Sequence, residues 1–415
     1  MIQRKRFLLR TLAPGLLVAA TGVGAGDLAT GAFSGSAIGP AILWAVLIGA
    51  LLKFVLSEGL ARFQLQTGQT LLEGALLRTP VPLRYLFLLY LIPWSWFVGS
   101  ALISACGLTA NAMLPISDDP LIGKVVWGAA HSLLGLVLVR RGGYELFGRM
   151  MSVAVGIMFV TVVWTALALG FDSGEVLRGL FIPTIPEASG EGLTWTVALI
   201  GGVGGTLTLL CYGYWIREEG RFDPSALKLC RIDLAVGFSV TAVFGIAMVL
   251  IGSRIETSGR GSGLIVSLAE ELGGELGSGA RWAFLIGAWG AVFSSLVGVW
   301  QAVPYIFADF WRLRRGQAGD SVSEVDASAR PYRLYMYALA LIPLLGLFGS
   351  FKQAQKAYSV VGAAFLPLLA LSLLWLNRKA VVGEAQANRM PSILSLVAIL
   401  AFFVLAGWIK LAGSN

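Results

Sequence analysis

The residue with the clearest chemical potential is Asp27, an acid about halfway through a long apolar segment. No Lys or Arg lies within ten positions of it along the chain. A carboxylate inside a membrane costs about 3 kcal/mol unless it is solvated, paired or bound to a cation, so a functional role is the first interpretation. The alternative role is a cap for a broken helix. The sequence predicts that Asp27 contacts a cation.

Two clusters of glycine accompany this acid, one in the same apolar segment and one much further along the chain. Residues 22–26 contain three glycines and residues 201–205 contain four. Each glycine costs a helix about 1 kcal/mol relative to alanine, so a cluster favours local unwinding. Inside a membrane, unwound backbone survives only where it is buried or lines a wet cavity. One cluster alone is also explained by close helix packing, whereas the pair indicates two broken helices.

The elements that position these residues are transmembrane helices. Of the 415 residues, 57% are hydrophobic and 13% are charged, whereas soluble proteins have about 25% charged residues. Apolar segments of about 20 residues, the length that spans a bilayer, recur along the chain. This composition excludes a soluble enzyme and a nucleic-acid-binding module. We therefore expect an all-α integral membrane protein whose surroundings are the lipid bilayer.

The hydropathy pattern predicts about eleven transmembrane helices and an amphipathic helix at 264–276. The eleven spans are expected near residues 12–36, 38–57, 84–113, 121–139, 150–170, 193–216, 231–252, 281–308, 333–350, 356–376 and 391–411.

Most of the 31 Lys and Arg residues lie in alternate loops, including the N-terminal segment and the 312–333 loop. Because basic residues near span ends stay in the cytoplasm, this distribution predicts a multi-pass protein of the cell (inner or plasma) membrane with a cytoplasmic N-terminus. The net charge of +8 therefore reflects topology and does not indicate a nucleic-acid partner.

The two glycine clusters fall in spans one and six. An offset of five spans turns the second copy upside down relative to the first, as in transporters built from inverted repeats. We expect one transmembrane domain, 1–415, made of repeats 1–170 and 193–376 with an additional helix at 391–411. In such 5+5 proteins the broken helices 1 and 6 form the binding site at the membrane midplane.

Several motifs in this order resemble the Nramp family of divalent-metal transporters, which shares the inverted-repeat fold of amino-acid transporters. Residues 24–30 stand where the family has DPGN and a small-residue stretch. In the eighth span, Ser294-Ser295 followed by Gly298 and Gln301 looks like the family's serine-rich pattern, and Asn388-Arg389-Met390-Pro391 opens the last helix in a similar way.

The resemblance implies a substrate site, although several residues depart from the family pattern. The Asp and Asn of DPGN fall on Gly24 and Asp27, and Met-Pro-His-Asn of span six falls on residues 209–212. The implied substrate-binding residues are Gly24, Asp27, Gly204, Thr206, Leu209, Cys211 and Tyr212, with Asp27 and Thr206 as metal ligands. The family's third-span acids have no counterpart in 86–108.

The family methionine falls on Leu209, so the implied ligands are oxygens, which suit Mg²⁺ or Mn²⁺ better than Cd²⁺. In a shifted register, the Cys211 thiolate would restore a soft ligand; otherwise Cys211 is a small buried hydrophobe. His131, the only histidine, is a candidate proton relay or a hydrogen-bonded structural residue. Lys53 is expected to extend its ammonium to the cytoplasmic interface.

These observations predict a secondary transporter that moves a small cation, a divalent metal, by alternating access around Asp27, with a coupling ion and no cofactor. The alternative is a carrier of a small organic solute, an amine or an amino acid, on the same fold. Its aromatic surface would come from Trp94, Trp96, Tyr212, Tyr214 and Trp215. An intramembrane enzyme is disfavoured because Asp27 has neither a second mid-span acid nor a histidine beside it in the sequence.

Overall fold

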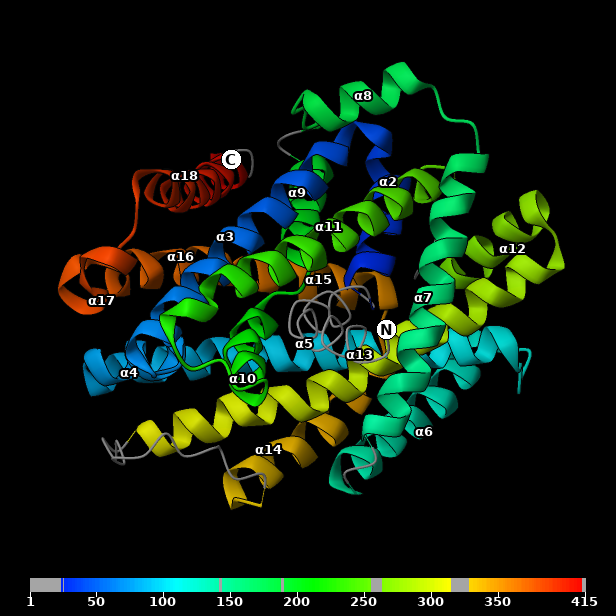
Figure 1. Cartoon of the computed structure of the whole chain (residues 1–415). Coiled ribbons are helices and arrows are strands. Elements are labelled where there is room, and N and C mark those ends of the chain that lie inside the picture. Colours follow the sequence, from blue (N-terminus) through cyan, green and yellow to red (C-terminus); the bar gives the residue numbers. More distant parts are fainter. Residues whose placement is uncertain are drawn as a thin grey trace, which may run out of the picture.

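The computed structural model describes residues 24, 26–141, 144–187, 190–254, 263–314 and 328–412. Every regular element in these ranges is helical (Figure 1). In chain order the elements are η1 (Gly26–Thr30), α2 (Gly31–Ile38), η2 (Gly39–Ile42), α3 (Leu43–Thr67), α4 (Leu71–Arg78), α5 (Val81–Met113), α6 (Pro120–Arg141), α7 (Tyr144–Ala168), α8 (Ser173–Phe181), α9 (Glu191–Gly202), η3 (Leu207–Leu210), α10 (Cys211–Glu218), η4 (Pro224–Ala226), α11 (Leu227–Gly252), α12 (Leu264–Leu276), α13 (Ser278–Leu313), α14 (Arg330–Leu341), η5 (Ile342–Phe348), α15 (Phe351–Ala363), α16 (Phe365–Leu376), α17 (Lys379–Gln386) and α18 (Met390–Ala412).

Within these ranges, nine helical stretches are long and apolar enough to cross a membrane, or ten if the bent pair Val155–Ala168 and Ser173–Phe181 is one span. The all-α membrane class is confirmed, and α12 is the amphipathic helix expected at 264–276. The span expected at 150–170 belongs to the bent pair. The spans expected at 12–36 and 38–57 fall in one continuous helical stretch of 42 residues, Gly26–Thr67, while residues 12–23 lie outside the described part of the chain. This stretch changes direction at Gly39, whose φ is +77°, so α2 and α3 diverge in Figure 1.

The helices around the second glycine cluster pack closely. Figure 1 places α9 and α11 at the centre of the bundle, between α3 and α2. Helix α11 contacts α2, α3 and α7, while α15 packs against α9 and α5. A Cβ atom at Gly35 would lie 2.1 Å from the carbonyl oxygen of Val249, so α2 can approach α11 this closely only with glycine there. This packing brings the start of α2 beside the end of α9.

Candidate functional site

The sixth predicted span is interrupted at the glycine cluster. Helix α9 ends at Gly202, and helical structure resumes in η3 at Leu207. Between them, Gly204 and Gly205 have φ angles of +77° and +84°, in the left-handed region that glycine adopts at little cost. The glycines therefore account for the break, which lies inside the apolar stretch Glu191–Arg217.

Asp27 connects this break to the first predicted span. It lies in the π-helix η1 and is fully buried. Its Oδ1 accepts a hydrogen bond of 2.8 Å from the backbone N–H of Gly204. Its Oδ2 is buried and has no hydrogen-bond partner in the part of the chain that the structure describes. One carboxylate oxygen therefore holds the two glycine clusters together, and the other is left without a protein donor.

Lys53 also lies at this break, and the expectation that it reaches the membrane interface is wrong. Its side chain is fully buried. The ammonium donates hydrogen bonds to the carbonyl oxygens of Gly201, at 2.8 Å, and Val203. It also interacts electrostatically with Asp27. Helix α3 packs against α9, which places the middle of α3 beside the carbonyls that the break leaves unused by helix hydrogen bonds.

Thr206 ends the break and is held by aromatic residues from two other helices. Its Oγ1 accepts a hydrogen bond of 2.9 Å from Nε1 of Trp94 on α5. The ring of Tyr358 on α15 lies 6.2 Å from that of Trp94, and its hydroxyl oxygen lies 3.9 Å from the position of a Cβ on Gly26. Trp94, which the sequence offered as part of an aromatic surface, thus lies beside Thr206. Tyr358 was missed.

Gly24 precedes η1 in the chain and lies against α13. A Cβ atom there would come 1.9 Å from Oγ of Ser295, so the backbone of Gly24 touches the serine pair of the eighth predicted span. Its carbonyl oxygen accepts a hydrogen bond of 3.1 Å from the N–H of Leu28. This carbonyl therefore has a partner within the chain, and the role of Gly24 in substrate binding stays a prediction.

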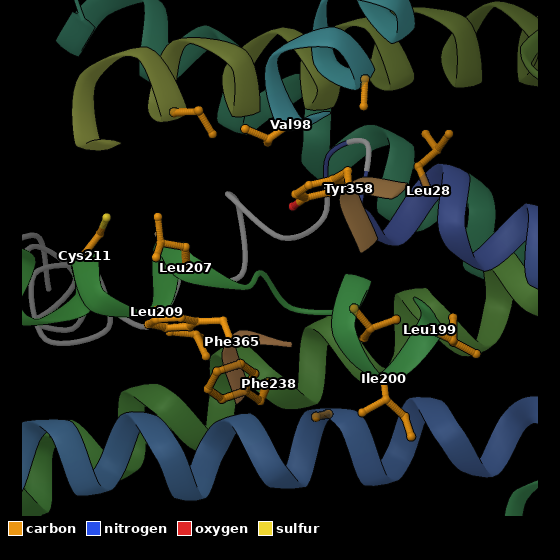
Figure 2. Packing of buried hydrophobic residues seen from close by; sticks show 14 of the residues in the cluster. Leu28, Val98, Leu199, Ile200, Leu207, Leu209, Cys211, Phe238, Tyr358 and Phe365 are labelled. Atoms are coloured by element: carbon orange, nitrogen blue, oxygen red, sulfur yellow. The ribbon is translucent and has the colours of Figure 1, made fainter. Parts of the chain in front are cut away.

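Three of the predicted site residues, Leu209, Cys211 and Tyr212, follow the break in the chain. All three are buried, and Tyr212 belongs to a polar cluster with α11. Leu209 is fully buried and lies near Phe238 and Phe365 (Figure 2). Cys211 is buried at the start of α10. The hydroxyl of Tyr212 donates to Asp233 on α11 at 2.7 Å, and Asp233 also pairs with Arg221.

The structure therefore brings Asp27, Gly204 and Thr206 to the break between α9 and η3, and it ties Tyr212 to α11 instead. The described residues include no group of three or more His, Cys, Asp or Glu side chains that could hold a metal ion. Besides the carboxylate of Asp27, the oxygens of the break itself come from the hydroxyl of Thr206 and from backbone groups.

The chain also matches a family model. The model described as natural resistance-associated macrophage protein-like, Nramp, covers residues 15–412. The chain belongs to the Nramp family.

Curated relatives of this Nramp-family chain include divalent metal cation transporters named MntH. The protein from Bacillus subtilis is 24% identical over 268 residues, which cover 60% of this chain and 59% of the relative. The one from Verminephrobacter eiseniae is 23% identical over 412 residues, covering 95% of this chain and 88% of the relative.

Solved structures share the fold. The manganese transporter of Eremococcus coleocola, in complex with an aromatic bis-isothiourea compound, superposes with a TM-score of 0.68 at 17% identity, covering 98% of this chain and 93% of that one. MhsT in complex with L-phenylalanine gives a TM-score of 0.62 at 17% identity and covers 98% of each chain. The Nramp-family chain thus has the fold of inverted-repeat transporters, which confirms the expected class.

His131 is hydrogen-bonded through both ring nitrogens. Nδ1 lies 2.6 Å from the carbonyl oxygen of Trp127, and Nε2 accepts from Nε1 of Trp289 at 2.7 Å. Since Trp289 can only donate, this network assigns the proton to Nδ1 and a neutral ring. Both nitrogens are used by neighbours in this conformation, so a role as proton relay stays a prediction.

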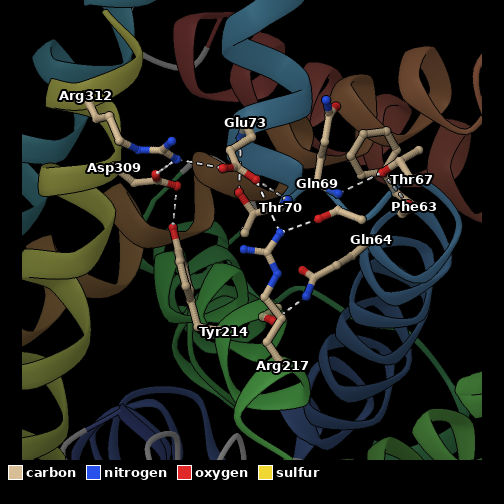
Figure 3. Close-up of polar contacts among 12 residues, drawn as sticks. Phe63, Gln64, Thr67, Gln69, Thr70, Glu73, Tyr214, Arg217, Asp309 and Arg312 are labelled. Carbon is tan, nitrogen blue, oxygen red and sulfur yellow. Dashed lines mark hydrogen bonds and ion pairs between the residues drawn. The ribbon is translucent and has the colours of Figure 1, made fainter. Parts of the chain in front are cut away.

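A network of ion pairs joins the ends of α4, α10 and α13 (Figure 3). Glu73 on α4 accepts from Arg312 at 2.7 Å and from Arg217 at 3.3 Å. Arg312 also pairs with Asp309, which accepts from the hydroxyl of Tyr214 at 3.0 Å. Glu73 further completes a capping box by accepting from the N–H of its N-cap residue. The Lys and Arg distribution predicts that this end of the bundle is cytoplasmic.

The electrostatic balance at Glu73 makes this network sensitive to acid. Burial raises the pKa of Glu73, but the backbone N–H of Thr70 and the guanidiniums of Arg312 and Arg217 outweigh it and hold the pKa below its usual value of 4.5. A carboxyl with a lowered pKa contributes stability above its unfolded pKa, and this contribution is lost as the pH falls through the folded pKa.

We therefore expect Glu73→Gln to lower the free energy of unfolding by about 1–3 kcal/mol at pH 7, because two guanidiniums lose their charged acceptor. Thermal unfolding in detergent measures the difference, which should shrink as the pH falls below 4.5. The control is Glu384→Gln, since Glu384 pairs with Lys379 on the exposed surface of α17. Its change should stay within about 0.5 kcal/mol. An equal effect of both variants at pH 7 would contradict a stabilising role for the ion pairs of Glu73.

Proposed function

We propose that this chain is a secondary transporter that moves a small cation, a divalent metal ion, by alternating access around Asp27 and the two interrupted spans. The observation that carries the proposal is Oδ2 of Asp27, a buried carboxylate oxygen beside the break at 203–206 that has no hydrogen-bond partner among the described residues. A buried carboxylate oxygen without a donor is a strong ligand for a cation. The names of the curated MntH relatives support the same class of cargo.

Alternating access requires two halves that rock about the site. We assign these halves to repeats 1–170 and 193–376, with 391–411 as an additional helix. Asp27 belongs to the first and Gly204 to the second, so the hydrogen bond between them spans the boundary between repeats. A cation bound at Oδ2 would sit at that boundary, where a change in the relative position of the repeats alters access from either side.

The ligand chemistry favours a hard cation. Besides the carboxylate of Asp27, the break contains the hydroxyl oxygen of Thr206 and backbone carbonyl oxygens, and oxygen ligands suit Mg²⁺ and Mn²⁺. Leu209 packs among apolar side chains, so the position matched to the family methionine supplies no sulfur. Cys211 begins α10, after η3. In the view of Figure 2, Leu207 lies between Cys211 and Leu28, the residue that follows Asp27.

We expect proteoliposomes to take up Mn²⁺ and Mg²⁺ in preference to Cd²⁺, and Cys211→Ser to leave this preference unchanged. Uptake is measured with each cation in turn and in competition. The matched control is Cys106→Ser, because Cys106 is another fully buried cysteine. Strong Cd²⁺ preference that disappears only in Cys211→Ser would overturn the hard-cation assignment and place the thiolate in the site.

The second candidate is a carrier of a small organic cation, and the observation that favours it is the pair Trp94 and Tyr358 beside Thr206. Faces of Trp and Tyr attract ammonium groups. The same uptake assay, extended to small amines and amino acids, separates the two functions. Amine uptake with no response to any metal ion would replace the metal proposal by this one.

A further inference from the structure

The site already contains a cation that belongs to the protein. The Lys53 ammonium is fully buried and donates to the carbonyl oxygens of Gly201 and Val203, at the end of α9. Carbonyls released at a helix break are the ligands that transporters of this architecture offer to a bound cation. In this conformation, a side chain from α3 takes them.

Lys53 and Asp27 hold the same peptide unit from opposite ends. The peptide that joins Val203 to Gly204 presents its carbonyl to Lys53 and its N–H to Asp27. In a trans peptide these two groups point in opposite directions within the peptide plane, so the positive and negative charges lie at opposite edges of the peptide unit. The peptide dipole is aligned with both charges, and the charges also attract each other.

The charge of the site follows from this arrangement. One carboxylate and one ammonium give no net charge, so a divalent ion added beside them would bring two uncompensated charges into a buried place. A site with Asp27 alone would keep one negative charge for the ion. Lys53 therefore opposes the binding of a divalent cation both by its charge and by occupying two carbonyl ligands.

Two buried hydroxyl groups near Lys53 are candidate alternative acceptors for its ammonium. Ser57 lies one helical turn beyond Lys53 on α3, and its Oγ has no hydrogen-bond partner among the described residues. The same holds for Oγ1 of Thr241 on α11. A Cβ on Gly204 would lie 3.3 Å from Cγ2 of Thr241 and 3.4 Å from Cδ of Lys53, so both side chains border this glycine. Both hydroxyls can accept from an ammonium.

We propose that Lys53 is a tethered competitor of the transported cation. Its ammonium occupies the carbonyls of Gly201 and Val203 while the site is empty, and it moves toward the hydroxyls of Ser57 and Thr241 when the substrate ion takes its place. Lys53 is then a specificity-determining residue that weakens divalent-ion binding and so favours release. This inference rests on the proposed function, because it treats Asp27 as the ligand of a transported cation.

The test is Mn²⁺ binding to the full-length protein in detergent, measured by titration calorimetry, together with Mn²⁺ uptake by proteoliposomes. Lys53→Gln keeps a hydrogen-bond donor and removes the charge, so we expect it to bind Mn²⁺ about fivefold more tightly than wild type. Lys53→Arg keeps the charge and should bind no more tightly than wild type. Lys124→Gln is the matched control, because Lys124 is also buried and donates to a backbone carbonyl, that of Gly349.

The outcomes separate this inference from the proposed function. Unchanged or weaker binding in Lys53→Gln, while wild type transports Mn²⁺, overturns the competitor role and leaves the transport proposal standing. Binding by Lys53→Gln, with no divalent ion bound or transported by wild type, supports the competitor role and overturns divalent transport. No binding by either protein overturns both.

If Lys53→Gln does not fold, the isosteric variant Thr241→Val combined with Ser57→Ala provides the test. It leaves Lys53 and Asp27 intact and removes both alternative acceptors. The tethered ammonium then has no second place, so we expect Mn²⁺ binding to weaken about threefold. Unchanged binding in this folded variant would overturn the proposed movement of Lys53.

Discussion

Replacing Asp27 by asparagine is expected to reduce cation uptake by at least about tenfold while leaving expression and folding intact. The carboxylate contributes a charged ligand, and the loss of a charge-assisted contact is worth about 1.5–3 kcal/mol. Asparagine retains an oxygen that can accept from Gly204 in the way that Oδ1 does. The substitution therefore removes the charge and preserves the connection between η1 and the break. Initial rates of uptake by proteoliposomes with equal protein content measure the effect.

This substitution also distinguishes a ligand from a helix cap. Asn and Asp cap helices about equally well, so a residue that only caps should tolerate the change. Asp172 is the matched control, because its side chain caps α8 by accepting from the N–H of Gly174 at 2.7 Å. Asp172→Asn should transport like wild type. Wild-type uptake by Asp27→Asn as well would make Asp27 a structural cap and remove the basis of the proposed function.

The spans and the break could be predicted because their physical causes are local. A run of apolar residues long enough to cross a bilayer is visible in the sequence, and so is the cost of several glycines within one helical turn. The contact between Asp27 and Gly204 followed in outline, because inverted-repeat transporters place their two broken helices side by side. The direction change at Gly39 was also visible as a Gly-Pro turn between two apolar runs.

Lys53 could not be placed in the same way, since α3 is apolar on most of its surface. A helix in lipid has no polar face that marks the outside, so periodicity does not show which side meets the core. Proximity to the expected span end suggested the interface. The signal that could have identified Lys53 is its residue type alone, because ionisable residues within spans are by default functional.

Residues 209–212 follow the break, and their role as substrate-binding residues stays a prediction. The break and the 3₁₀ turn that follows it change the rotation per residue, so linear matching to a family motif does not show which side chains face Asp27. Leu209 belongs to the same buried apolar cluster as Phe238 and Phe365, and the hydroxyl of Tyr212 donates to Asp233. Thr206 lies within the break itself, and its role as a metal ligand stays a prediction.

Gly204→Ala is expected to reduce uptake by at least about tenfold, because the conformation of this residue sets the shape of the break. Its φ of +77° lies in the left-handed region, where alanine costs about 1–2 kcal/mol. A Cβ atom would also lie 3.2 Å from Cε1 of Phe238, which is closer than most Cβ contacts. Its distance of 3.4 Å from Cδ of Lys53 is at the lower limit of ordinary van der Waals contact. We expect the backbone to respond by turning the N–H of Gly204 away from Asp27, which breaks the hydrogen bond between η1 and the break.

Gly39→Ala is the matched control for this substitution. Gly39 has the same φ of +77°, but no atom lies within 4 Å of the position of its Cβ. A substitution at Gly39 therefore strains the backbone without crowding and without a contact to Asp27. We expect it to lower thermal stability and to leave the uptake rate per folded molecule near that of wild type. Uptake that falls equally in both variants would show that backbone strain alone matters, and that the peptide between Asp27 and Lys53 has no special part in transport.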